Sequence, residues 1–356
     1  DAPFCPSSNS SFSLYSCNFL SLEISAMSMA APTLNFCGVL SESKRIINAH
    51  SRHFLALSVL FILPLSFSFI IYPTLHHTLS QSEPTHTKAL LRYTTSDDHR
   101  LETLALPLIY TFFVLFLSLC AVATITYSTY HGFYGRPVKL VSAIKSLFYS
   151  FIPLFTTAAV SHVVVVLICT VFGLFVFLVT KGVEFLGFEI DYSSNYFTGF
   201  CAVVLIILGL VLVYLQVNWA LACVIVVVES KWGFEPLRRS TYLVRGMRWV
   251  SLSLLLFFGA SIGFLVWSST GLAGVNLVGF TDGWKSWAFI VQTVVSSSFV
   301  TLLMLHNAAS NTVLYMYCKA MHGELAWEIA EEFAREYVSL PFDDEKVPHV
   351  VYVVQA

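Results

Sequence analysis

The sequence predicts an all-α integral membrane protein with six transmembrane helices and cytosolic amphipathic helices. The first reason is composition: hydrophobic residues make up 56% of the 356 residues and charged residues 11%, whereas soluble domains carry about 25% charged residues. The second reason is distribution, because six windows lack Asp, Glu, Lys and Arg, and each exceeds the roughly 20 residues that a helix needs to cross a bilayer. The windows are 53–82, 103–135, 146–180, 192–228, 249–281 and 286–318.

These windows divide the chain into three regions. Residues 32–320 form the six-span domain, with spans expected near 54–72, 104–127, 152–179, 198–228, 250–268 and 287–317. Pro64 removes a backbone donor from the first span, which predicts a kink there. We interpret residues 1–31 as an upstream extension with a disordered N-terminus, and residues 321–356 as a cytosolic amphipathic helix and tail.

The basic residues predict the orientation of the spans. The flanks of the N-terminus, of the loops after spans two and four, and of the C-terminus hold 14 lysines and arginines, whereas the other three loops hold 5. Positively charged loops stay on the cytosolic side. Both termini are therefore expected in the cytosol, in an endomembrane or the plasma membrane.

Three segments outside the spans have helical patterns. Residues 138–148, which follow Pro137, repeat apolar side chains at helical spacing, and a second helix is expected to open at Pro236. We expect both to lie flat at the membrane surface before they turn into the next span. Glu324–Val338 has an apolar row at every fourth residue beside five glutamates. Two interpretations remain open for it: a solvated helix, or a helix whose acidic face docks on the basic loop after span four.

The loop after span four carries the most specific motif. An acidic residue ends the span, a glycine follows four residues later, and the motifs Leu-Arg-Arg-Ser and Leu-Val-Arg-Gly precede the next span. This block resembles the membrane domain of glycerophosphoryl diester phosphodiesterases and related bacterial inner-membrane proteins. Most of the chain is similar to a plant family of uncharacterised six-span membrane proteins. The candidate structural or interfacial residues in the block are Glu229, Gly233, Arg238, Arg239, Ser240, Arg245 and Gly246.

The resemblance implies the membrane fold and not the hydrolase activity. A catalytic barrel needs about 250 residues, and the six-span region leaves no such segment. Arg238, Arg239 and Arg245 are expected near the anionic headgroups of the cytosolic leaflet. Glu229 is a candidate partner for one of these arginines.

Polar side chains within the spans are few, and they have two interpretations. They hydrogen-bond between helices and hold the helices in register, or they line a path for a solute or lipid. The candidate path residues are His162, Gln216, Asn218, His306, Asn307 and Asn311. In span five, Gly259 and Gly263 form a Gly-x-x-x-Gly step, which favours close helix contact inside the bundle or between protomers.

The sequence holds no motif for catalysis, a cofactor or a metal. The histidines and aspartates of the first loop, from His76 to His99, match no ligand spacing, so we expect a solvated loop. The preferred function is a non-catalytic membrane scaffold or assembly factor. The alternative is a transporter, channel or lipid-handling protein, and an enzyme is third. The expected partners are the lipid bilayer and other proteins or a second copy, and the net charge of −2 argues against nucleic acid.

Overall fold

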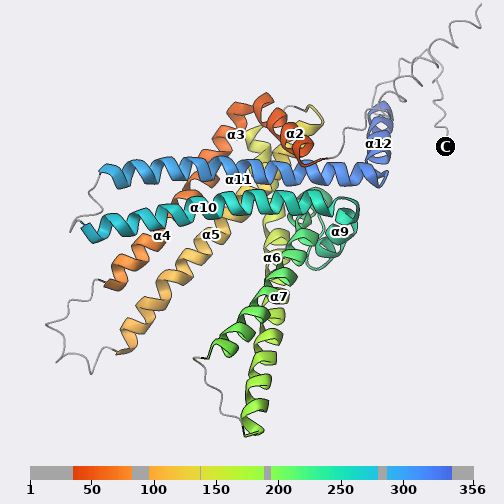
Figure 1. The fold of residues 1–356 in the computed structure, drawn as a ribbon. Helices are drawn as coiled ribbons and strands as arrows, with labels where there is room; N and C mark the ends of the chain where they lie inside the picture. Colours follow the sequence, from red (N-terminus) through yellow and green to blue (C-terminus); the bar gives the residue numbers. More distant parts are fainter. Residues whose placement is uncertain (1–34, 82–95, 137, 188–193, 280–286, 339–356) are drawn as a thin grey trace, which may run out of the picture.

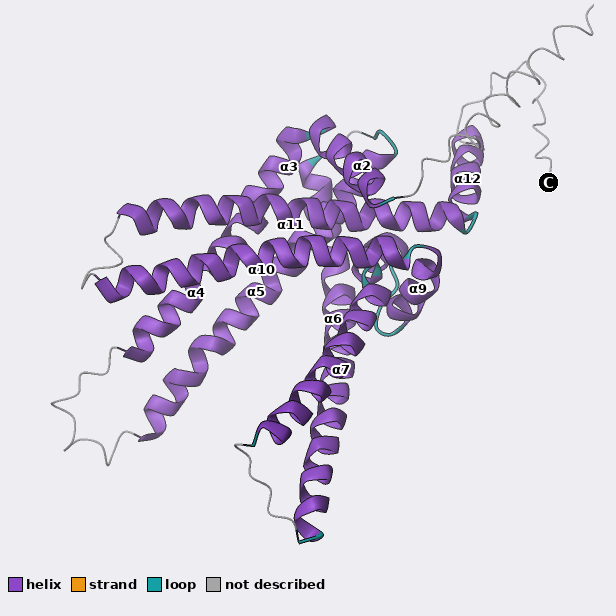
Figure 2. Cartoon of the chain, in the orientation of Figure 1, coloured by secondary structure: helices purple, strands orange, loops and turns teal. Residues whose placement is uncertain are grey.

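The computed structural model describes residues 35–81, 96–136, 138–187, 194–279 and 287–338 (Figure 1). The described residues form helices and short loops and contain no β-strand (Figure 2). The predicted N-terminal extension and the tail after residue 338 lie outside them, as do the side chains of the histidines and aspartates in the first loop.

The helices follow the chain from α2 to α12. Their bounds are α2 (Phe36–Ala49), α3 (Ser51–Leu57), the π-helical turn η1 (Ser58–Ile62), α4 (Leu63–Gln81), α5 (Ser96–Phe133), α6 (Leu140–Phe185), α7 (Asn195–Trp219), α8 (Ala222–Glu229), α9 (Glu235–Leu243), the 3₁₀ turn η2 (Val244–Gly246), α10 (Arg248–Gly279), α11 (Trp287–Met321) and α12 (Glu324–Val338).

Six helical segments are long and apolar enough to cross a membrane. They are Ser51–Pro73, Pro107–Phe133, Leu140–Phe185, Asn195–Glu229, Arg248–Ser269 and Ile290–Met321. The all-helical class and the six apolar segments are thus confirmed, and the protein is compatible with integral membrane insertion.

The helices separate into two arms. In Figure 1, α4, α5, α10 and α11 extend to one side, whereas α6 and α7 extend downwards. The arms meet near α9, and α12 stands across the end of α11. No residue of α6 beyond Thr157 is buried, so the distal half of α6 leaves the bundle.

The main core lies where the arms join. It contains Phe54 from α3, Ile125 from α5, Ile225 from α8 and Val313 from α11, all at most 1% exposed. Polar side chains also join the helices: Ser66 and Thr301 approach within 2.7 Å, and His53 and Ser128 within 2.8 Å. Such bonds hold helices in register where no water is available.

Pro64 lies next to the irregular turn of the first span. The π-helical turn η1 ends at Ile62, and the backbone N–H of Leu63 bonds to Ser58 O, five residues earlier. Proline cannot donate the next backbone hydrogen bond. The structure thus has a widened turn directly before Pro64, and the kink itself stays a prediction.

The prediction of a separate surface helix over 138–148 is wrong. Residues 140–185 form one uninterrupted helix, about 70 Å long at 1.5 Å per residue. The reason is that one buried face crosses the expected boundary at helical spacing and packs against α5 and α8. This face consists of Ala143, Leu147, Ser150, Leu154 and Thr157.

The fourth span differs from its prediction in the opposite way. We expected one helix over 198–228, but the helix breaks between Trp219 and Ala222. The break leaves backbone groups unpaired, and the hydroxyl of Ser240 on α9 bonds to two of them. It donates to Asn218 O at 2.7 Å and accepts from Leu221 N at 3.2 Å.

Candidate functional site

The acidic residue of the sequence motif, Glu229, lies at the centre of an ion-pair cluster. It is the last residue of α8, and its side chain is 13% exposed. Tyr315 on α11 donates a hydrogen bond to its Oε1 at 2.9 Å, and Lys231 Nζ lies 3.5 Å from its Oε2. Burying a carboxylate is costly unless it is paired and hydrogen-bonded, and these contacts supply both.

Arg239 connects its own helix, α9, to α8 through Glu229 and to α12 through Glu324. Its Nε lies 3.4 Å from Glu229 Oε2, and its Nη2 bonds to Glu324 on α12. Burial opposes the charged form of Arg239, but the bonds to Glu324 and Glu229 outweigh it and raise the pKa of the guanidinium above its usual value. The group therefore remains charged, and the pairing predicted for Glu229 is formed with this arginine.

A second ion pair lies beside the first. Lys319, near the end of α11, donates to Glu328 Oε2 at 2.6 Å, and its side chain is 10% exposed. Tyr130 on α5 donates to Glu328 Oε1 at 3.0 Å. The acidic face of α12 thus contacts α5, α9 and α11, which favours the docked interpretation of this helix.

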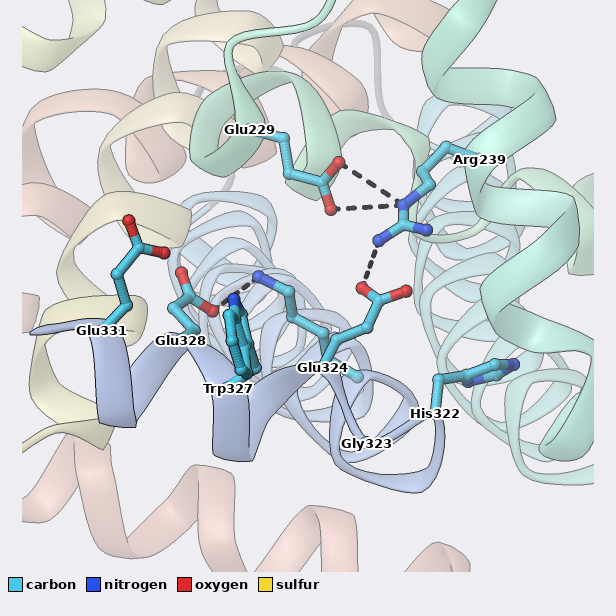
Figure 3. Close-up of a pocket in the computed structure, with 9 residues that line it drawn as sticks. Glu229, Arg239, His322, Gly323, Glu324, Trp327, Glu328 and Glu331 are labelled. Atoms are coloured by element: carbon cyan, nitrogen blue, oxygen red, sulfur yellow. Dashed lines mark hydrogen bonds and ion pairs between the residues drawn. The ribbon is translucent and has the colours of Figure 1, made fainter. Parts of the chain in front are cut away.

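The two pairs line an open pocket of about 490 Å³. Figure 3 shows Glu229 and Arg239 on one side and the residues of α12 on the other. The lining residues are Glu229, Arg239, Lys319, His322, Gly323, Glu324, Trp327, Glu328 and Glu331. We name these nine residues the hub. No group of three or more His, Cys, Asp or Glu in the described part of the chain is arranged to hold a metal.

Two further motif residues attach the elements that carry the hub to neighbouring helices. Gly233 has a φ of +74°, a conformation that side chains with a Cβ rarely adopt, and its N–H donates to Thr157 Oγ1 at 3.1 Å. This bond attaches the α8–α9 loop to α6. Ser240 is fully buried and closes the break in span four, as described above.

The remaining motif residues lie elsewhere. Arg238 and Arg245 are exposed, and no carboxylate of the described residues pairs with either. Gly246 lies against α11, where an added Cβ would come within 2.9 Å of Met321 Cε. The motif therefore divides into residues that hold helices together and arginines that point outward.

The six candidate path residues do not form one site. His162 and Gln216 are exposed on their helices, contrary to the expectation that they face the interior. Asn307 and Asn311 share a face of α11, where Asn311 Nδ2 donates to Asn307 Oδ1 at 3.2 Å. His306, also on α11, is half-buried and bonds to its own helix at Leu302 O.

Asn218 is the buried member of that set. It is 3% exposed, and its Nδ2 donates to Tyr214 O on its own helix. Its Oδ1 is buried and lacks a partner among the described residues. None of the six candidate path residues lines the hub pocket.

The glycine step of span five faces outward. Gly259 and Gly263 are exposed, and an added Cβ at either position would meet no atom within 4 Å. The prediction that they make a close contact inside the bundle is wrong, because Leu254 and Phe258 occupy the inner face of α10 instead. The contact between protomers stays a prediction.

Sequence reasoning missed Tyr130, Tyr315 and Lys319. Tyr315 lies in a predicted span, and Tyr130 and Lys319 lie shortly after one. The partner of Tyr315 is 86 residues away in the sequence, and that of Tyr130 is 198 residues away. A lysine directly after an apolar window was a usable signal, since a cation at the end of a span needs a partner.

The fold and the hub define an all-helical protein with six helices able to cross a membrane, tied at one end by ion pairs. The chain belongs to a family described as Domain of unknown function (DUF8558), whose profile matches residues 28–346. No curated protein matches, and no solved structure matches. These comparisons supply no link to the phosphodiesterase membrane domains or to plants.

Proposed function

We propose that this protein is a non-catalytic membrane scaffold or assembly factor. The observation that carries this proposal is that residues of the sequence motif form contacts between helices. Glu229, Arg239 and Ser240 are engaged in contacts between helices, and the pocket lined by Glu229 and Arg239 is open and crossed by ion pairs. A residue that is fully engaged in holding helices is a weak candidate for turnover of a substrate.

The same proposal includes the membrane and the orientation. The basic residues of the α8–α10 segment support a cytosolic hub, in an endomembrane or the plasma membrane, with both termini on that side. The exposed Gly259 and Gly263 support contact with a second copy or another membrane protein. The resemblance to the membrane domains of phosphodiesterases stays part of the proposal for the fold.

The alternative is a transporter, channel or lipid-handling protein. One observation favours it: the unpartnered Oδ1 of Asn218 is a buried polar atom, and such atoms are retained in membranes mainly where they have a function. Asn307 and Asn311 are half-buried on α11, and their amides are further polar groups within an apolar helix.

A flux assay separates the two proposals. The purified chain is reconstituted in liposomes, and movement of labelled lipids and of a panel of small solutes is followed beside Asn218→Leu and Asn307→Leu with Asn311→Leu. A scaffold should give the rate of protein-free liposomes. Saturable flux that either variant abolishes at normal folding would establish the alternative and contradict the scaffold.

Cross-linking in native membranes supplies the positive result. A photo-reactive amino acid replaces Trp327, which is 67% exposed beside the hub, and a matched one replaces Val171 on the distal part of α6. A scaffold should give a discrete protein adduct from position 327 and lipid adducts from position 171. Lipid adducts alone from both positions would contradict it.

A further inference from the structure

One exposed stripe alternates aromatic residues and arginines along α9, η2 and the start of α10. Its members follow one another at spacings of four, four, three and four residues. Arg238 and Tyr242 share one face of α9, whereas Arg245 lies in the 3₁₀ turn and Trp249 lies in α10, after the break at Met247. The members are Phe234, Arg238, Tyr242, Arg245 and Trp249. We name them the arginine stripe. The opposite face, with Leu237, Ser240 and Leu243, is buried in the core.

The arginines of the stripe carry charge that the protein does not neutralise. Lys231 and Arg239 have carboxylate partners, whereas Arg238 and Arg245 have none among the described residues. The sequence from residue 236 to residue 281 contains no Asp or Glu. The one acid of α9, Glu235 at its first residue, pairs with Lys231, so the surface after it presents unpaired guanidinium groups.

A third arginine adds to this surface. Arg248 opens α10, and its guanidinium carbon lies 5.9 Å from the ring centroid of Tyr214 on α7. Its Nε is buried and lacks a hydrogen-bond partner among the described residues. A buried N–H of a charged group is costly to leave without an acceptor. Because the Nε itself is buried, only the exposed part of this half-buried side chain can reach a lipid headgroup.

The stripe continues into the apolar surface of a membrane-length helix. Trp249 is 81% exposed and starts the outer face of α10, which continues with Leu256, Phe264 and Trp267 at helical spacing. Tyrosine and tryptophan concentrate at headgroup depth, where the ring is apolar and its polar edge is wet. The arginine stripe therefore lies at the boundary between the headgroups and the acyl chains.

We propose that the arginine stripe, together with Arg248, is a docking surface for the anionic phospholipid headgroups of the adjacent leaflet. Guanidinium groups match the geometry of phosphate oxygens, and the aromatic rings of the stripe insert between headgroups. This inference deepens the proposed membrane scaffold, since it names the lipid class that the hub end meets. It also assigns Arg239 to the protein interior and the other three arginines to lipid.

The test uses the full chain purified in a neutral detergent. Short-chain phosphatidylserine or phosphatidylcholine is titrated in, and the melting temperature is followed by tryptophan fluorescence. Phosphatidylserine should raise the melting temperature of the wild-type chain more than phosphatidylcholine does. Arg238→Gln with Arg245→Gln should reduce the phosphatidylserine effect to that of phosphatidylcholine, and Arg238→Lys with Arg245→Lys should retain most of it.

The matched control is Lys44→Gln with Arg52→Gln. It removes two positive charges that are exposed on α2 and α3 and lie outside the stripe. The control should keep the preference for phosphatidylserine. An equal loss in the control would contradict a docking surface at the stripe and assign the preference to net charge.

Two further outcomes would overturn the proposal. Equal shifts of the melting temperature by both lipids in the wild-type chain would contradict a lipid-docking surface and favour an acidic protein as the partner of the stripe. If glycerophosphoserine, which has the headgroup and no acyl chains, shifts the melting temperature as much as phosphatidylserine does, the ligand of the stripe is a soluble anion and not a bilayer lipid. Because this assay contains no partner protein, its failure leaves the scaffold proposal standing, and a failed cross-linking test leaves the lipid result standing.

Discussion

Two adjacent arginines of one motif have different surroundings. The side chain of Arg239 is 22% exposed and contacts the carboxylates of Glu229 and Glu324, whereas Arg238 is exposed and has no carboxylate partner in the described chain. The same side chain therefore has a structural role at one position and an outward-facing role at the next.

This difference makes a matched pair of variants. Arg239→Gln should destabilise the chain by about 1–3 kcal/mol, because it removes the cation shared by Glu229 and Glu324 and leaves Glu229 with Lys231 as its remaining cation. Arg238→Gln should change stability by no more than about 0.5 kcal/mol in neutral detergent. Thermal melting of the two purified variants measures the contrast, and equal midpoints would contradict the role of Arg239.

Ser240 is the second residue with a specific structural role. Its hydroxyl bonds to the backbone at Asn218 and Leu221, where span four breaks. Ser240→Ala should cost about 1–3 kcal/mol for each buried backbone group left without a partner. Ser253→Ala is the control, because Ser253 is exposed and bonds only within α10. A melting temperature for Ser240→Ala that equals the control would show that water replaces the hydroxyl.

At the scale of elements, α12 depends on charge for its contact with the bundle. Glu324 pairs with Arg239 on α9, and Glu328 pairs with Lys319 on α11. Its aromatic residue Trp327 is exposed and lines the pocket (Figure 3). Electrostatic contacts thus place this helix, with Leu325 adding an apolar contact to the core.

Neutralising these carboxylates should release the helix. Glu324→Gln with Glu328→Gln should raise amide hydrogen exchange across residues 324–331 and leave α10 and α11 protected, since local opening follows the loss of local contacts. The control is Glu42→Gln, which removes a surface pair with Arg45 that contributes little. Unchanged exchange in the double variant would mean that apolar contacts alone hold α12.

At the scale of the whole molecule, the two arms leave much of their apolar surface exposed. The distal half of α6 and most of α7 extend away from the arm of α4, α5, α10 and α11 (Figure 1). Only 6% of the apolar window in α6 and 11% of that in α7–α8 are buried. These exposed apolar surfaces favour an apolar medium such as a bilayer, whose hydrocarbon core of about 30 Å covers less than half of the roughly 70 Å length of α6.

The proposed orientation is tested by labelling. Single cysteines replace Ser82 and Phe234 in a chain from which the eight native cysteines have been removed, expressed in sealed cells. An impermeant thiol reagent should label residue 82 from outside and residue 234 only after the membrane is opened, because the basic α9 segment is expected in the cytosol. The reverse pattern would invert the topology, and equal labelling would contradict the six-span arrangement.

The sequence alone determined the fold class and the six apolar helices, and it predicted a helix opening at Pro236, which the structure begins one residue earlier, at Glu235. It also determined α12, whose bounds of Glu324 and Val338 follow directly from its apolar row. These features depend on the local composition and periodicity of a single segment, and both can be read without knowing the neighbours of that segment. The pairing of Glu229 with one arginine of the loop was predicted for the same reason, since only ten residues separate it from Arg239.

Only the tertiary structure decided which arginine faces inward and that Tyr315 and Glu324 complete the hub. Those contacts join positions 86 and 85 residues apart, and periodicity assigns a residue to a face without naming what covers that face. The same limit explains the continuous α6 and the broken span four. In α6, packing against α5 and α8 continues a helix where the local pattern predicted a turn, and in span four the Ser240 hydroxyl from another helix bonds to backbone groups that an unbroken helix would have paired.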